Sequence, residues 1–249
     1  MKKINEKKTV IYILILIILL LVGLFFKYKN TSAPTLTNPS GEVFVSEVIS
    51  IKSKGIKERN FSGKVSVIEG NSKLALKAQA YVDNAVVEFK KQADVDVPAM
   101  RAQFGEDVAS SQYEIIIDAK YIISENTESV AILTYEYTGG AHGNNSYNVI
   151  TASKTSGGIL DLSSVIKTEK QKSFTDFVKK DLLAWRPLES TETVVFTEEV
   201  SGLTFESFTN WSLDDKNLIL YFSQYDIGPG VLGPVAYPIS LEKIKDMLK

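Results

Sequence analysis

A run of 17 residues without a charged side chain, residues 10–26, constrains the fold of this chain more than any other feature. At about 1.5 Å per residue, a helix of this length spans about 25 Å, close to the hydrocarbon core of a membrane at about 30 Å. Four lysines precede the run, and two follow it at Lys27 and Lys29. Because the more positive flank stays in the cytoplasm, the sequence predicts a cytoplasmic tail (1–9), a single-pass transmembrane anchor (10–27) and an extracytoplasmic remainder.

A cleaved signal peptide is the alternative interpretation of this segment. The apolar run is longer than that of a typical signal peptide, and the best small-residue cleavage site, residues 31–33, is followed by Pro34. We therefore expect an uncleaved anchor in the cell membrane. Residues 28–40 are rich in Thr, Ser, Asn and Pro and predict a linker, which leaves residues 41–249 for the extracytoplasmic domain.

Composition excludes several classes of function. The chain has no cysteine and a single histidine, His142, so thiolate sites and zinc sites built on several imidazoles are excluded. Of 28 basic and 30 acidic residues, six lysines and Glu6 lie in the first 29 residues, so the remainder has a net charge of −7. We expect no metal and no cofactor. We also expect no nucleic acid partner, because nucleic acid binding requires cations that neutralise phosphates. The acidic balance suits solubility or a basic partner.

Hydrophobic periodicity predicts an α+β fold. Apolar residues at helical spacing indicate an amphipathic helix over 72–92. Alternating residues over 112–124 indicate a long strand, which we expect to pair with 130–138 as an antiparallel hairpin, with 146–153 as the next strand. We divide the domain into an N-terminal part (41–125) and a C-terminal part (126–249).

The C-terminal part repeats this mixture of helices and hairpins. Ser173 is expected to cap a helix that ends before Pro187, and residues 214–217 form a turn ahead of a strand over 218–222. A short helix over 241–248 ends the chain. Helices between hairpins, without strict alternation of strand and helix, favour antiparallel sheets with packed helices.

The segment 135–145, YEYTGGAHGNN, does not read as ordinary sheet. Three glycines within five residues permit backbone conformations with positive φ and close approach of another chain. Two interpretations stay open. The segment is either a tight turn in which the imidazole bonds to backbone, or part of a binding site.

This segment resembles the signature of the extracytoplasmic domain family shared by the lysozyme-sensing anti-sigma factor RsiV and the non-catalytic region of the peptidoglycan deacetylase PdaC. The resemblance continues in LDLSSVI at 160–166, in YFSQYDIGP at 221–229 and in the closing YPI at 237–239. It covers roughly residues 41–249. It implies a membrane-anchored binding module of the cell envelope that recognises a lysozyme-like protein or cell-wall glycan.

The sequence departs from both branches of that family. The tail of about eight residues is too short to hold a sigma factor, and the deacetylase domain is absent from the sequence given. We take the tyrosines, glycines and polar residues of the two most specific motifs as candidate binding residues. They are Tyr135, Tyr137, Gly139, Gly140, His142, Gly143, Asn144, Tyr225 and Pro229.

Two other functions remain as alternatives to the binding module. A hydrolase of envelope material would use His142 or paired carboxylates, for which Glu198–Glu199 and Asp214–Asp215 are the candidates, although the sequence lacks a Gly-x-Ser-x-Gly elbow. A structural or assembly protein would use the anchor to hold a complex. We expect a binding module and no catalytic residues.

Overall fold

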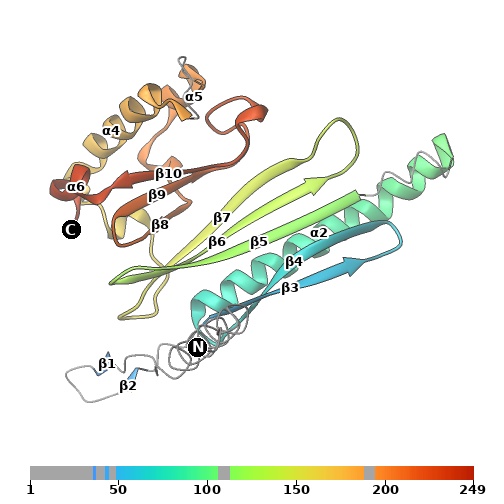
Figure 1. Cartoon of the computed structure of the whole chain (residues 1–249), viewed down its shortest axis with the longest axis horizontal. Coiled ribbons are helices and arrows are strands. Elements are labelled where there is room, and N and C mark those ends of the chain that lie inside the picture. The colour runs from blue at the N-terminus through green and yellow to red at the C-terminus, as the bar shows by residue number, and fades with distance from the viewer. Residues whose placement is uncertain (1–35, 38–42, 45–48, 106–112, 188–193) are drawn as a thin grey trace, which may run out of the picture. The chain divides into compact units, whose positions relative to one another are not determined.

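The computed structural model describes residues 36–37, 43–44, 49–105, 113–187 and 194–249 (Figure 1). The chain divides into two units, Met1–Ser46 and Glu47–Lys249. In the first unit the described residues form two short antiparallel strands, β1 (Leu36–Thr37) and β2 (Val43–Phe44). The predicted tail, anchor and most of the linker lie outside the described residues. Among the helices that are described, none is long and apolar enough to cross a membrane.

In the described part of the second unit, five strands form one sheet in the order β3-β4-β5-β6-β7. Their bounds are β3 (Ser50–Lys57), β4 (Phe61–Glu69), β5 (Tyr113–Ile123), β6 (Thr127–Tyr137) and β7 (Asn144–Ser153). The predicted strands over 112–124, 130–138 and 146–153 are confirmed, and so is the antiparallel hairpin of the first two. The prediction of purely antiparallel sheets is wrong for this sheet, because β4 and β5 pair in parallel.

β4 and β5 can pair in parallel because the long helix α2 (Lys73–Phe104) connects them. The helix runs back along the sheet, so that β5 starts at the same end of the sheet as β4 (Figure 1). The hydroxyl of Ser72 caps the helix by accepting the N–H of Ala75 at 3.1 Å. The helix continues 12 residues beyond the predicted end at residue 92, since its buried stripe extends through Ala93 and Val97. α2 packs against one face of the sheet and forms its hydrophobic core there.

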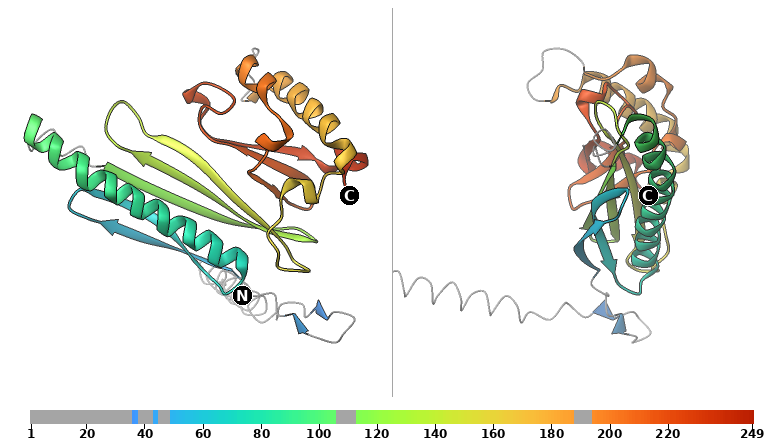
Figure 2. Two further views of the ribbon diagram at one scale, coloured as in Figure 1. Left: turned by 180° about the vertical axis from the view of Figure 1, so that it is seen from behind. Right: turned by 90° about the vertical axis from the view of Figure 1, so that its right-hand side faces the viewer.

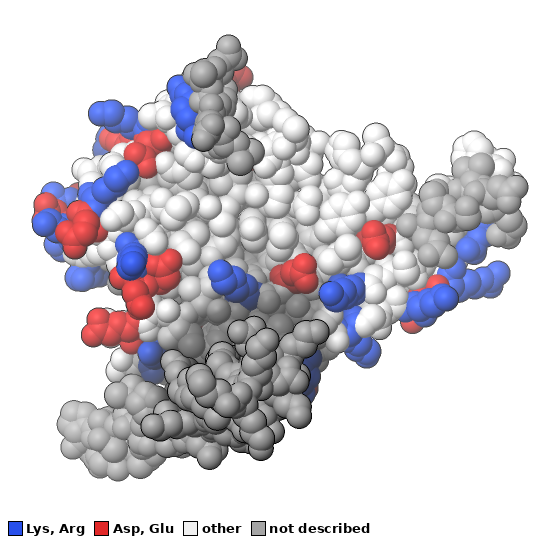
Figure 3. Space-filling view, viewed as in Figure 1, with Lys and Arg blue, Asp and Glu red and all other residues white. Residues whose placement is uncertain are grey.

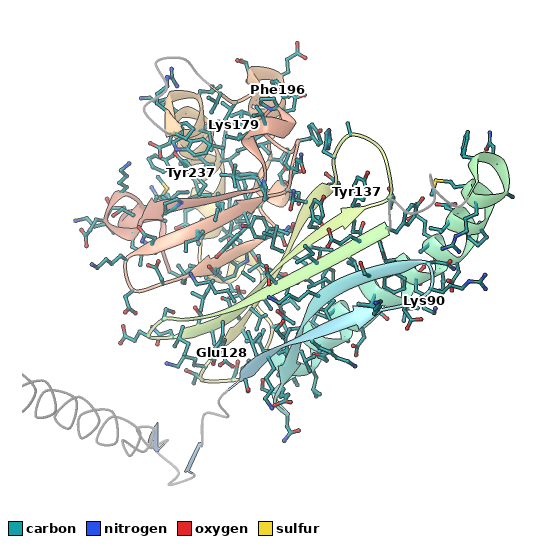
Figure 4. All side chains as sticks on the ribbon, turned by 45° about the vertical axis from the view of Figure 1, so that its right-hand side comes forward. Lys90, Glu128, Tyr137, Lys179, Phe196 and Tyr237 are labelled. Carbon is teal, nitrogen blue, oxygen red and sulfur yellow. The ribbon has the colours of Figure 1, made fainter. Side chains whose placement is uncertain are left out.

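Polar contacts fix the far part of α2 to the turn between β3 and β4. Lys90, labelled in Figure 4, lies 3.5 Å from Glu58 and 3.2 Å from Asp94. Asn60 in the turn donates to the carboxylate of Asp94 at 2.8 Å. These contacts connect the helix to the turn between β3 and β4.

A second, antiparallel sheet has the order β10-β9-β8 and its own hydrophobic core. Its strands are β8 (Trp211–Leu213), β9 (Asn217–Phe222) and β10 (Val235–Ser240), and its helices are α4 (Gln171–Ala184), α5 (Thr197–Gly202) and α6 (Leu241–Ile244). Short 3₁₀ helices connect them: η1 (Leu162–Ser164), η2 (Thr168–Lys170), η4 (Phe205–Ser207), η5 (Gly230–Leu232) and η6 (Lys245–Met247). Ser173 does not cap a helix, because α4 begins two residues earlier.

The second sheet packs on the face of the first sheet opposite α2 (Figure 2). Tyr147 of β7 and Tyr221 of β9 meet edge to face with ring centroids 5.0 Å apart. Further inward, the hydroxyl of Thr151 donates to the carbonyl of Trp211 at 2.7 Å. The two sheets are therefore joined by both apolar and polar contacts.

Side chains that flank the strands of the second sheet complete the outer edge of β7. The amide of Asn210 accepts the N–H of Val149 at 2.8 Å and donates to the carbonyl of Tyr147 at 3.1 Å. The hydroxyl of Ser223 accepts the N–H of Tyr147 at 3.0 Å. Polar side chains thus take the place of a neighbouring strand along this edge.

Candidate functional site

The loop between β6 and β7, residues 138–143, lies beside the connection between β9 and β10, residues 223–234. In Figure 4 the first loop follows the labelled Tyr137, and the labelled Phe196 lies in the part of the domain that contains the second sheet. We call residues 138–143, 223–234 and 194–196 the loop cluster. The arrangement brings together the two sequence motifs that carried the predicted binding residues.

Asn145 and Gln224 position the two loops relative to each other. The backbone N–H of Gln224 donates to the carbonyl of Asn145 at 2.9 Å. The backbone N–H and the side-chain amide of Asn145 both donate to Oε1 of Gln224, at 3.0 and 3.1 Å. The side chain of Gln224 in turn donates to the carbonyl of Gly230 at 3.2 Å. One glutamine therefore ties the start of β7 to two points of the connection between β9 and β10.

His142 contacts both loops. Its Nδ1 lies 3.0 Å from the carbonyl oxygen of Gly143. A carbonyl oxygen only accepts hydrogen bonds, so in the neutral ring Nδ1 carries the proton and Nε2 is the acceptor. Nε2 faces the hydroxyl of Tyr225 at 3.4 Å. Both ring nitrogens thus face groups of the described chain, and neither group is a serine hydroxyl or a carboxylate.

Tyr225 has a left-handed backbone with φ of 75°. Its ring folds back over Gly230, where a Cβ would lie 2.5 Å from the tyrosine hydroxyl oxygen. This conformation is uncommon for a residue with a large side chain and is held by the surrounding contacts. It leaves 47% of Tyr225 exposed at the rim of the loop cluster.

The glycines of the first loop have two different roles. Gly139 and Gly140 have φ of 91° and 98° and open space around them, so a side chain there would strain the backbone without a clash. Gly143 is buried against Tyr135, where a Cβ would lie 2.3 Å from the tyrosine ring. Tyr137 closes the loop by donating to the carbonyl of Gly140 at 2.9 Å.

The remaining predicted binding residues, Asn144 and Pro229, lie at the margins of the loop cluster. Asn144 is exposed at the start of β7, and Pro229 precedes η5. Sequence reasoning did not propose Asn145 or Gln224 as site residues, and it missed Phe196, whose backbone N–H donates to the carbonyl of Ile227 at 2.8 Å. The YFSQYDIGP motif contains Gln224, but a polar residue in a loop gives no signal of a partner 79 positions away.

The loop cluster exposes apolar side chains and few charges. The exposed fractions are 43% for Phe196, 47% for Tyr225 and 95% for Val231. The two main loops contain no lysine or arginine, and their only acid is Asp226. Figure 3 shows a largely uncharged surface in this region, whereas charged side chains lie at the left and right of the view and in a row across its middle.

Among the described residues, the acids that the sequence offered for hydrolysis make no hydrogen bond or ion pair with His142. Glu198 and Glu199 are exposed in the first turn of α5. Asp214 accepts hydrogen bonds within its own turn, and Asp215 beside it is exposed. Within the described ranges, no three Asp, Glu or His side chains are placed to hold a metal ion.

Comparisons with known proteins match the two halves of the domain separately. Residues 56–145 match the family model described as deacetylase PdaC, and residues 163–242 match that of a protein of unknown function, DUF3298. The first match ends with the loop that carries His142, and the second contains the loop that carries Tyr225. The loop cluster is therefore built by one motif from each matched segment.

Individual relatives agree with these matches. Peptidoglycan-N-acetylmuramic acid deacetylase PdaC of Bacillus subtilis (strain 168) is 22% identical over 186 residues, which are 72% of this chain and 37% of that protein. The chain thus spans little more than a third of the length of this relative. The resemblance to PdaC expected from the sequence is confirmed, and that to RsiV stays a prediction.

Two crystal structures share the fold. A DUF3298 family member from Bacteroides fragilis NCTC 9343 has a TM-score of 0.58 and 18% identity over 82% of this chain and 95% of that one. A DUF3298 family protein from Pseudomonas aeruginosa PAO1 has a TM-score of 0.52 and 15% identity over 87% and 95%. A PdaC-like segment at 56–145 followed by a DUF3298 segment at 163–242, together with the PdaC relative, supports a PdaC-like/DUF3298 domain.

Proposed function

We propose that this chain is a membrane-anchored binding module of the cell envelope, and that its loop cluster binds a protein partner with a basic surface. The observation that carries this proposal is the exposure of Phe196, Tyr225 and Val231 on loops that are held by hydrogen bonds. Exposed aromatic and aliphatic side chains on a fixed backbone are typical of the centres of protein interfaces.

The charge distribution supports a basic partner. From Asn30 onward the chain has a net charge of −7, and the two main loops carry no base. An acidic domain attracts a basic protein over a distance of about 10 Å at 0.1 M salt, and the apolar side chains then supply contacts that salt does not screen. Lysozyme, the partner expected from the sequence resemblance, is basic and is a suitable probe.

The localisation of the module is part of the proposal. The uncharged run at 10–26, flanked by lysines mainly on its N-terminal side, supports an anchor with the domain outside the cell. The similarity to PdaC, whose name refers to peptidoglycan, is consistent with a place in the envelope.

The test is calorimetric titration of the full chain in mild detergent with lysozyme, at about 0.1 M and about 0.5 M salt. We expect one-to-one binding at both salt concentrations. Val231→Asp should weaken binding at least about tenfold, because it places a charge in a desolvated contact. Val95→Asp is the matched control, since Val95 is 70% exposed on α2, away from the loop cluster.

Three outcomes would contradict the proposal. They are no heat of binding, heat that disappears at the higher salt concentration, and equal weakening by the two aspartate variants. Insoluble peptidoglycan incubated with the same proteins provides the comparison with a glycan partner. Retention on peptidoglycan that is lost only in Val231→Asp would assign the loop cluster to glycan instead.

A further inference from the structure

The helix α2 has an apolar stripe on the side opposite the one that it buries against the first sheet. At about 100° per residue, six exposed apolar residues project within an arc of about 100°. We call them the outer stripe: Leu76, Ala80, Val87, Val95, Pro98 and Ala102. The exposed fractions are 58% for Leu76, 48% for Val87 and 70% for Val95. Seen from behind, α2 crosses the near side of the first sheet, and no described helix or strand of the domain lies over it (Figure 2).

The helix α4 of the same domain has no such stripe. Apart from Ala184 at its end, its exposed residues are polar or charged: Lys172, Ser173, Asp176 and Lys180. A helix that buries one face in a core normally presents polar residues to water on the other, as α4 does. Of the nine large apolar side chains that are exposed in the described ranges, four belong to α2. The outer stripe is not needed for packing on the sheet, so it points to a second packing contact.

The outer stripe is complementary to itself when two copies of α2 lie antiparallel. With Val87 on a two-fold axis, Leu76 of one copy lies at the level of Pro98 of the other. In the same arrangement Ala80 lies at the level of Val95. Apolar residues then meet apolar residues over about six turns of helix. A contact of this kind uses the same surface on both copies and closes as a dimer.

The charges beside the outer stripe favour the antiparallel arrangement over a parallel one. In the antiparallel pair, Asp83 of one copy lies at the level of Lys91 of the other, and symmetry repeats this pair. In a parallel pair in register, Asp83 would lie beside Asp83 and Lys91 beside Lys91, and like charges repel. Lys91 bonds to Glu88 of its own helix at 2.6 Å, and an ammonium group with three donors can also bond to Asp83.

The size of the outer face predicts a weak dimer. A helix of 32 residues is about 48 Å long and about 10 Å wide, so one face of it covers about 500 Å². Two such faces bury about 1,000 Å² together, which is close to the lower limit for a specific interface. We therefore expect a reversible dimer with a dissociation constant in the micromolar range.

We propose that two copies of this chain pair through the outer stripe of α2, with the helices antiparallel and Val87 near the two-fold axis. The second sheet packs on the opposite face of the first sheet, so pairing through α2 leaves both loop clusters uncovered. The pairing does not depend on the protein-binding role proposed for the loop cluster. It would bring two loop clusters into one assembly, which could hold two partner molecules.

The absence of cysteine from the sequence allows a direct test by cross-linking of single cysteines. The full chain with Val87→Cys is treated with a short bismaleimide in mild detergent, and the dimer fraction is measured on a denaturing gel. We expect efficient cross-linking, because a residue near the two-fold axis meets its own copy. Val231→Cys is the matched control, since Val231 is 95% exposed in the loop cluster and should show only random collisions.

Two further variants test the register of the helices. Ala80→Cys and Val95→Cys should each cross-link poorly alone, since each position lies beside a different residue of the other copy. A mixture of the two variants, one of them enlarged by a fusion tag, should cross-link into a mixed dimer. Cross-linking of either variant with itself as strongly as in the mixture would contradict the antiparallel pairing.

Sedimentation equilibrium of the full chain in density-matched detergent measures the dimer without a cross-linker. Val87→Asp should raise the dissociation constant of the dimer at least about tenfold, because it places two like charges together at the axis. Val231→Asp should leave this constant unchanged. Val87→Asp should in turn leave the binding of lysozyme unchanged, which separates the outer stripe from the proposed protein-binding surface.

Two other results would also overturn the pairing. One is cross-linking of Val87→Cys no stronger than that of Val231→Cys. The other is a chain that stays monomeric at about 100 µM, well above the expected dissociation constant, or a dimer that Val87→Asp leaves unchanged. A far-ultraviolet circular dichroism spectrum of each variant checks that α2 remains helical.

Discussion

Gln224 and Asn145 lie 79 positions apart in the chain, yet they share three hydrogen bonds of 2.9 to 3.1 Å. Two of these bonds end on the same side-chain oxygen of Gln224. The pair joins the end of the first sheet to the connection between β9 and β10, and so sets the distance between His142 and Tyr225.

Replacing Gln224 by alanine should lower the free energy of unfolding by about 1–3 kcal/mol, because the N–H of Asn145 loses its acceptor. Urea denaturation measures this loss. Gln92→Ala, on the exposed face of α2, is the control and should cost nothing, since alanine favours a helix. Equal stability of the two variants would show that the pair does not hold the loops.

Gly143→Ala should destabilise the domain by about 1–3 kcal/mol, because its Cβ would overlap the ring of Tyr135. Gly55→Ala on the exposed strand β3 has open space and ordinary φ, so it should be neutral. Thermal unfolding of both variants provides the comparison. A neutral effect at Gly143 would mean that Tyr135 moves aside without cost.

Asn210→Ala should lower the free energy of unfolding by about 2–4 kcal/mol. The substitution leaves the N–H of Val149 and the carbonyl of Tyr147 without their partners at the interface between the sheets. Asn84→Ala, exposed on α2, serves as the control in the same urea titration. A loss below about 0.5 kcal/mol would show that water replaces the amide at little cost.

The decrease in the free energy of unfolding at acid pH should depend on Asp214. Burial opposes ionisation, but hydrogen bonds from the backbone of Lys216 and from the side chain and backbone of Asn217 outweigh it and lower the pKa of the Asp214 carboxyl. A lowered pKa in the folded state contributes stability above the ordinary pKa, and this contribution is lost as the pH falls through the folded value.

Asp214→Asn should therefore be less stable than the unmodified chain at pH 7 by about 1 kcal/mol, and the difference should shrink below about pH 4. Urea midpoints at pH 7, 4 and 3 test this expectation. Asp215→Asn, at the exposed neighbouring position, should show no such trend. A difference that stays constant with pH would assign the effect to packing instead of charge.

The sequence predicted the elements whose residues alternate or repeat strongly. The strands over 113–123 and 127–137 were placed within three residues, because their apolar residues alternate between buried and exposed positions. β3 and β4 were not predicted, since most of β3 is exposed and carries lysines on an open edge. Because β4 was not predicted, its parallel pairing with β5 could not be predicted either.

The candidate site was predicted in part. Glycine spacing and the two motifs pointed to the segments of His142 and Tyr225, and the structure places those two side chains together. The pairs that hold the loops, such as Asn145 with Gln224, were not predicted. A hydrogen bond between polar side chains depends on how the sheets pack, and it produces no periodic pattern along the chain.

The polar side chains that complete the edge of β7 also determine how long this edge stays unpaired while the chain is being synthesised. Asn210, Ser223 and Gln224 all come at least 57 residues after the last residue of β7. During synthesis the strand therefore presents unpaired backbone groups, which attract other strands, until the end of the chain arrives. Shortening that interval, for example by circular permutation, should reduce aggregation of newly made protein without changing a single contact in the finished domain.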